Sequence, residues 1–111
     1  MKPKRVLILD DDPAQIPGFR GWFARFQHGC DYQVVAAATA SETATALTEA
    51  RPDLVIFEPA TDSFDSLEIV SNLLRHDRTI LIIAASRGMN RAAIDSSFKL
   101  EIFAYIPKPV D

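Results

Sequence analysis

The regular alternation of short apolar runs with helix-patterned segments is the feature that most constrains the fold. Each apolar run is nearly continuous, which is typical of strands buried on both faces of a parallel sheet. The βαβαβαβαβ order predicts a doubly wound α/β fold with right-handed crossovers. The expected strands are Arg5–Leu9, Tyr32–Ala38, Leu54–Phe57, Ile80–Ala84 and a shorter one at Phe103–Ile106.

The first helical segment carries an aromatic face. Asp12 is placed to cap it and Pro13 to occupy its first position. Pro17 and Gly18 interrupt the pattern, so the helix either kinks there or begins at Pro17. The apolar positions, spaced three and four residues apart with one aromatic neighbour, are Ile16, Phe19, Trp22, Phe23 and Phe26.

Three further helices are expected between the remaining strands. The second starts near Ser41 and ends before Arg51-Pro52, and the third is capped by Asp65 or Ser66. The fourth, roughly 90–100, has the weakest pattern. The inner face of the third helix is expected to carry Leu67, Val70, Leu73 and Leu74.

Charged residues follow three of the expected strands. Asp10, Asp11 and Asp12 follow the first strand, Glu58 the third and Lys108 the fifth. In an open parallel sheet the binding site lies beyond the carboxyl ends of the strands. Hard cations such as Mg²⁺ prefer carboxylate oxygen, so a cation site is one interpretation. The alternatives are a solvated turn with a helix cap, and a structural ion pair between Glu58 and Lys108.

Composition excludes several classes of protein. The chain has 111 residues and a net charge of −3, which favours neither nucleic acid nor anionic membrane as a direct partner. A single cysteine, Cys30, allows no internal disulfide and fits a reducing cytoplasm. No apolar run approaches 18 residues, so no membrane span is expected. With only four glycines, no Gly-rich loop follows the first strand, so a different phosphate- or nucleotide-binding domain is the weaker alternative.

Four segments, in order and at the right spacing, resemble the receiver domain of bacterial two-component response regulators. The segments are residues 6–13 (VLILDDDP), 52–58 (PDLVIFE), 64–69 (FDSLEI) and 105–109 (YIPKP). The resemblance covers nearly the whole chain, so residues 1–111 are expected to form one receiver-like domain. It implies the CheY-like strand order 2-1-3-4-5.

The resemblance also implies a set of site residues. In this family an acid pair after the first strand binds Mg²⁺, and an aspartate after the third strand accepts phosphate from a histidine kinase. Asp10 and Asp11 match the acid pair, Glu58 stands at the phosphoacceptor position, and the carbonyl of Ala60 is the expected further metal ligand. Lys108 matches the lysine that pairs with the phosphate.

Two more positions follow from the family pattern near the chain's end. Tyr105 matches the family's switch aromatic, which lies three residues before the lysine matched by Lys108. The Lys108–Pro109 bond is a candidate for the cis form, which an X-Pro bond adopts at modest cost.

The departures from the family pattern bear most on function. Glu58 replaces aspartate, and its extra methylene extends the carboxylate by about 1.5 Å. The hydroxyl residue that ends the fourth strand falls on Ala85 when counted from Glu58 and on Ser86 when counted from Lys108. Pro59 fixes the backbone directly after the acid and removes an N–H donor.

The family continues into a fifth helix, and this sequence ends at Asp111. The expectation is therefore that the fifth helix is missing and that the chain is part of a longer protein. Otherwise a neighbour, such as a second copy in a homodimer, covers the exposed apolar surface.

These features predict an atypical pseudo-receiver that acts as an interaction module in two-component signalling without normal aspartyl phosphorylation. It would contact a protein partner or an attached output domain, and it would not be an enzyme. The alternative is a working phospho-receiver that uses Mg²⁺ and takes phosphate from a histidine kinase.

Overall fold

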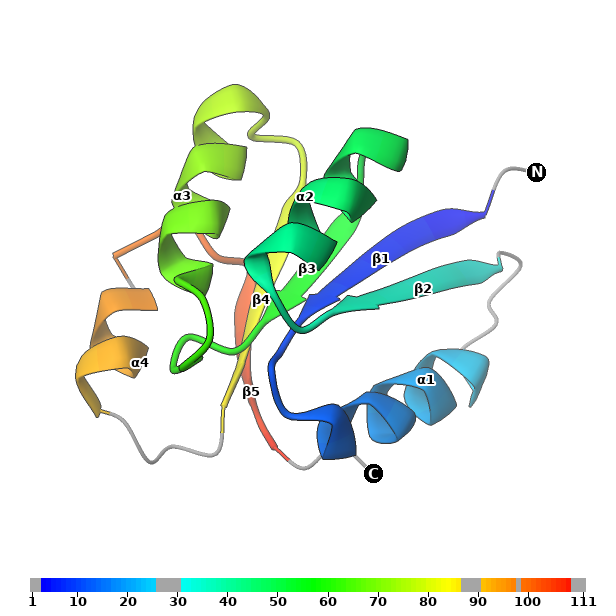
Figure 1. The fold of residues 1–111 in the computed structure, drawn as a ribbon, viewed down its shortest axis with the longest axis horizontal. Coiled ribbons are helices and arrows are strands. Elements are labelled where there is room, and N and C mark those ends of the chain that lie inside the picture. Colours follow the sequence, from blue (N-terminus) through cyan, green and yellow to red (C-terminus); the bar gives the residue numbers. More distant parts are fainter. Residues whose placement is uncertain (1–2, 26–30, 87–90, 98, 109–111) are drawn as a thin grey trace.

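The structure is a computed structural model that describes residues 3–25, 31–86, 91–97 and 99–108. Five parallel strands form one sheet in the order β2-β1-β3-β4-β5, as Figure 1 shows. The predicted doubly wound five-stranded parallel sheet is confirmed. The strands are β1 (Lys4–Leu9), β2 (Tyr32–Ala37), β3 (Leu54–Phe57), β4 (Leu81–Ser86) and β5 (Ala104–Pro107).

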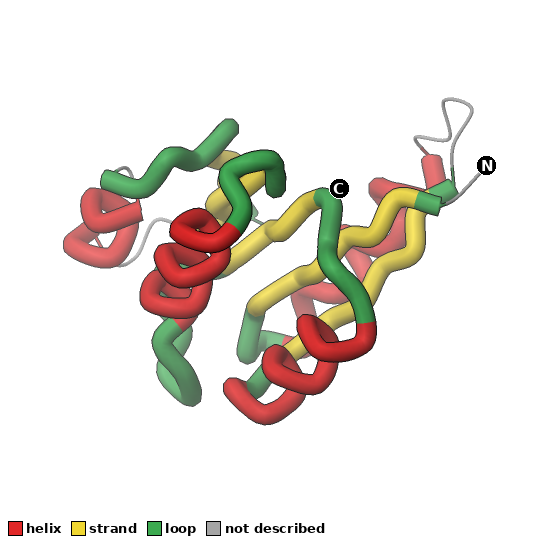
Figure 2. The backbone as a smooth tube through the Cα atoms, turned by 90° about the horizontal axis from the view of Figure 1, so that it is seen from above, coloured by secondary structure: helices red, strands yellow, loops and turns green. Residues whose placement is uncertain are grey.

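Four α-helices connect the strands, with a 3₁₀ turn before the first. They lie on both sides of the sheet, which the view in Figure 2 makes plain. Within the described residues no helix is long and apolar enough to cross a bilayer. The elements are η1 (Pro13–Gln15), α1 (Ile16–Arg25), α2 (Ala40–Glu49), α3 (Ser66–His76) and α4 (Arg91–Ser97).

Alternating side chains of the strands build two apolar layers, because successive residues of a strand point to opposite faces. On one face Leu7 and Leu9 of β1 join Phe57, and α2 and α3 cover them. On the other face Val6 and Ile8 pack against Phe19 and Phe23 of α1, so the predicted aromatic face of α1 is core. Phe26 lies outside the described residues.

The helix starts are set by side-chain caps. Asp12 accepts a hydrogen bond from the Ala14 N–H and caps η1, and α1 then begins at Ile16, one residue before Pro17. Thr39 caps α2 and Asp65 caps α3. The second helix therefore begins at Ala40 and not near Ser41 as predicted, because the Thr39 Oγ1 accepts from the Glu42 N–H and caps it.

β4 differs most from its expected bounds. It runs to Ser86 rather than Ala84, because pairing with β5 continues through Ser86↔Pro107. β5 is likewise shifted by one residue toward the C-terminus, since the expected Phe103 start lies before Ala104. Both shifts carry the two strands further toward the edge where the charged residues lie.

Candidate functional site

The register of the sheet brings three charged positions to one edge. Leu9 pairs with Phe57, so Asp10 and Glu58 follow at the ends of neighbouring strands. The Glu58 N–H donates to the Leu9 carbonyl at 2.9 Å, which holds the two chains together past the last pair. At the same edge, between β4 and β5, the Lys108 N–H donates to the Ser86 carbonyl at 3.0 Å.

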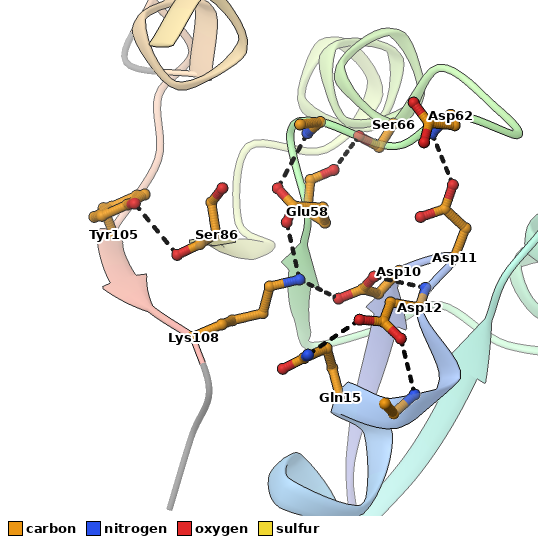
Figure 3. Close-up of polar contacts among 12 residues, drawn as sticks. Asp10, Asp11, Asp12, Gln15, Glu58, Asp62, Ser66, Ser86, Tyr105 and Lys108 are labelled. Carbon is orange, nitrogen blue, oxygen red and sulfur yellow. Dashed lines mark hydrogen bonds and ion pairs between the residues drawn. The ribbon is translucent and has the colours of Figure 1, made fainter. Parts of the chain in front are cut away.

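The side chains of Asp10, Glu58 and Lys108 form one buried ion group (Figure 3). The Lys108 Nζ lies 2.6 Å from Asp10 Oδ2 and 2.9 Å from Glu58 Oε1. The exposed fractions are 3% for Asp10, 8% for Glu58 and 9% for Lys108. Charged groups this buried are stable only when they are paired and hydrogen-bonded, and here one ammonium bridges two carboxylates.

The remaining oxygens of the two acids accept backbone hydrogen bonds. Asp10 Oδ1 accepts from the Asp12 N–H at 2.9 Å, and Glu58 Oε2 accepts from the Ala60 N–H at 3.1 Å. The hydroxyl of Ser66, at the start of α3, donates to the Glu58 carbonyl at 2.5 Å. Among the described residues no buried side-chain nitrogen or oxygen lacks a partner, so the group is fully satisfied as it stands.

Burial dominates the protonation of Asp10. Desolvation raises the pKa of Asp10 above its ordinary value of 3.8, because it penalises the charged carboxylate. The hydrogen bond and charge of Lys108 and the Asp12 N–H act in the opposite direction, and the nearby Glu58 carboxylate adds to the rise. Burial of two acids with one base thus leaves Asp10 less acidic than usual.

Asp11 does not join this group, although it adjoins Asp10 in the sequence. Its Oδ2 accepts from the Asp62 N–H at 2.7 Å and the Ser63 N–H at 3.0 Å, with the Ser63 hydroxyl at 3.3 Å. The Ser63 Oγ also lies 3.0 Å from the Ala38 carbonyl. Burial alone would raise the pKa of Asp11, but the bonds from Ser63 and Asp62 outweigh it and lower the pKa.

The arrangement of these oxygens does not fit a divalent cation. The donors are of the type that Mg²⁺ prefers, but the Lys108 ammonium lies between Asp10 and Glu58, and Asp11 turns toward the loop after β3. Ala60 contacts Glu58 through its N–H. Across the described ranges no three or more His, Cys, Asp or Glu side chains are grouped closely enough to hold a metal.

The expected switch positions lie beside the ion group. Ala85 is buried and pairs with Ile106, while Ser86 ends β4 and is also buried. The Tyr105 hydroxyl lies 3.4 Å from the Ser86 carbonyl, to which it donates. Their roles in switching stay predictions, and the proposed cis bond at Pro109 lies outside the described residues.

Sequence reasoning missed the part that Asp62, Ser63 and Ser66 play around the acids. Two of them act through backbone N–H groups, which every non-proline residue has, so residue type gives no signal. Ser63 and Ser66 carry a weak signal, since short hydroxyl residues in a loop often bond to nearby backbone. Which carbonyl or carboxylate they reach depends on the path of the loop.

This chain belongs to the response regulator receiver domain family, whose pattern it matches over residues 6–111. Fold and strand order agree with that membership. The domain is therefore a receiver of the two-component phosphorelay type.

Curated relatives include protein-glutamate methylesterase/protein-glutamine glutaminase proteins. That of Nitrobacter hamburgensis is 30% identical over 97% of this chain, and that of Bradyrhizobium diazoefficiens, of a group 2 operon, is 31% identical over 96%. The chain spans 28% and 27% of the length of these two relatives.

Solved structures show the same fold. The signal receiver domain of an HD domain-containing protein from Pseudomonas fluorescens superimposes with a TM-score of 0.82 at 17% identity, covering 100% of this chain and 79% of that one. A CheY-like receiver domain protein from Methanospirillum hungatei gives a TM-score of 0.76 at 23% identity, covering 99% and 85%. At these identities the likeness concerns the fold.

Proposed function

We propose that this domain is an atypical receiver that signals through protein contacts, without a normal cycle of aspartyl phosphorylation. The observation that carries the proposal is the state of Glu58. One of its carboxylate oxygens lies 2.9 Å from the Lys108 ammonium, and the other accepts the Ala60 N–H. The residue at the phosphoacceptor position is thus engaged on both oxygens.

The length of Glu58 adds to this argument. Phosphoryl transfer depends almost entirely on placing the attacking oxygen, the cation and the phosphorus in line. A side chain longer by about 1.5 Å misplaces the attacking oxygen, and an error of about 1 Å costs on the order of 10²-fold in rate. The same length lets Glu58 reach Lys108 and imitate part of the charge of a phosphorylated aspartate.

An exposed apolar pair supports a role in protein contacts. Phe103 is 71% exposed and Leu81 is 50% exposed. They lie at the starts of neighbouring strands, since the Phe103 N–H donates to the carbonyl of Ile82, next to Leu81. A partner protein or an attached output domain, such as the relatives' methylesterase part would be, is the proposed recipient of the signal.

The deciding experiment is incubation of the protein with Mg²⁺ and acetyl phosphate, followed by intact-mass measurement. The wild-type chain is expected to gain no phosphoryl group. Glu58→Asp, alone and combined with Ala85→Thr, is expected to recover some phosphorylation, because it restores the shorter acid. A phosphoryl gain in the wild type that Glu58→Gln abolishes would overturn the proposal in favour of a working phospho-receiver.

A further inference from the structure

Two adjacent acids of this chain, Asp10 and Asp11, perform different tasks. Asp10 is buried against the Lys108 ammonium, and Asp11 is held by the loop between β3 and α3. Their side chains leave the backbone in different directions (Figure 3). An acid pair that shares one cation would instead direct oxygens of both residues to a common point.

We infer that the pocket keeps its conformation without a divalent cation, with Lys108 as its internal cation and Asp11 as a positioning residue for the loop 59–65. This inference rests on the proposed function and deepens it, because it states what holds the site in one conformation. It differs from the family expectation of Mg²⁺ at Asp10 and Asp11.

Lys108 would compete with a divalent cation for the space between Asp10 and Glu58 and for their charge. Mg²⁺ needs oxygen ligands at about 2.0–2.1 Å in near-octahedral geometry. The Lys108 Nζ already lies 2.6 Å from Asp10 and 2.9 Å from Glu58. A divalent ion between those carboxylates would have to displace the ammonium, whose side chain is only 2% exposed. A buried ammonium that loses its carboxylates is costly.

Asp11 would lose several hydrogen bonds if it turned toward a cation. Its Oδ2 accepts two backbone N–H groups of the loop and lies within reach of a hydroxyl. Hydrogen bonds to a charged acceptor contribute more than neutral ones. Turning this carboxylate toward a cation would take that acceptor away from the Asp62 and Ser63 N–H groups.

Asp11 and Ser63 also join three loops of the fold. Asp11 lies between β1 and η1, Ser63 between β3 and α3, and Ala38 between β2 and α2. The Ser63 hydroxyl lies within hydrogen-bond distance of both other residues. The pair therefore fixes the loop after Glu58 relative to the first two strands, which keeps the Ala60 N–H on the Glu58 carboxylate.

The primary test is a titration of the ¹⁵N-labelled wild-type protein with MgCl₂, at matched ionic strength in NaCl. Amide shifts of residues 10–12 and 58–63 are expected to show no saturable response. Mn²⁺ serves as a second probe, because it takes the same oxygen ligands and broadens nearby signals. Saturable shifts or selective broadening centred on these residues would overturn the inference.

Variants test the two roles separately. Lys108→Gln removes the internal cation, so saturable Mg²⁺ binding is expected to appear. Asp11→Ala is expected to speed hydrogen exchange at the Asp62 and Ser63 amides, and Asp11→Asn, which keeps an acceptor oxygen, should restore part of the protection. Asp62→Asn is the matched control, because it also removes one negative charge, from the loop that Asp11 holds, and leaves the backbone N–H of residue 62 in place.

The outcomes separate this inference from the proposed function. Mg²⁺ binding by the wild type without phosphoryl gain would overturn the inference and leave the proposed function standing. Phosphoryl gain would overturn the proposed function by itself. Unchanged exchange at Ser63 in Asp11→Ala would overturn the positioning role, and since it is measured in a folded variant, general unfolding cannot produce it.

Discussion

The two edges of the sheet carry similar charges in different surroundings. At the carboxyl edge, Lys108 and its two acids have side chains that are 2–10% exposed. At the amino edge, Arg51 pairs with Asp53 and Asp77, and these side chains are 30–48% exposed. Exposed pairs contribute little because water and salt screen them, whereas a buried charge that loses its partner is strongly destabilising. Burial, more than the number of ion pairs, therefore decides which of the two edges contributes more to the stability of the fold.

The pKa values of the aspartates at the two edges also differ. Desolvation raises the pKa of Asp10 at the carboxyl edge. At the amino edge the hydrogen bond from Arg51, aided by Thr79, lowers the pKa of Asp77 well below its ordinary value. The pKa of an aspartate is therefore shifted upward at the carboxyl edge and downward at the amino edge.

Loss of the buried cation should have the largest effect. Lys108→Met leaves Asp10 and Glu58 buried without a counter-ion, so the free energy of unfolding is expected to fall by about 3–5 kcal/mol. Urea denaturation followed by far-UV circular dichroism measures it. Lys99→Met, at an exposed lysine, is the control and should change little. A loss no larger than that of the control would mean that the ion group behaves as if solvated.

The pH dependence of stability should separate the two edges next. Because the pKa of Asp10 is raised in the folded state, the folded protein keeps the Asp10 proton to a higher pH than the unfolded chain does. The contribution of Asp10 to stability therefore falls as pH rises from about 3.8 through the folded-state pKa. The folded-state pKa of Asp77 is lowered, so its contribution is present above 3.8 and is lost as pH falls through that pKa.

Carboxyl ¹³C NMR titrations of Asp10 and Asp77 test this directly. The midpoint of Asp10 is expected above 3.8 and that of Asp77 below it. Urea denaturation of Asp10→Asn and Asp77→Asn from acid to neutral pH should show opposite slopes of the stability difference from wild type. Slopes of the same sign would break the contrast between the edges.

The smallest effect is expected at the amino edge. Arg51→Gln removes the partner of Asp77, but both side chains are substantially exposed, so the loss of stability should be far below that of Lys108→Met. It should also shrink as NaCl is added, because salt screens exposed pairs. Urea denaturation at low and high salt is the measurement. A large loss that salt does not reduce would show that this exposed network is as important as the buried one.

Much of the fold could be predicted from patterns in the sequence. Continuous apolar runs identified the strands, and three- and four-residue spacing identified Phe19 and Phe23 as the buried face of α1. The charged residues at strand ends identified the edge where Asp10, Glu58 and Lys108 meet. Such predictions succeed because burial of one face of a helix or strand makes apolar residues recur at regular spacing in the sequence.

The division of work between Asp10 and Asp11 could not be predicted in the same way. The two residues are identical in type and adjacent in sequence, and only the paths of the loops decide which one meets Lys108 and which one meets Ser63. The extension of β4 to Ser86 had the same origin, since pairing with β5 determines where the strand ends.

By itself, then, the sequence determined the alternation of strands and helices, the charged residues that follow the strands and the long acid at position 58, because apolar periodicity and residue type are written in it. The tertiary structure alone decided that Lys108 bridges Asp10 and Glu58 while Asp11 holds a loop. The physical reason is range: hydrogen bonds and ion pairs form only within about 4 Å, and residues 98 positions apart come that close only when the sheet is assembled.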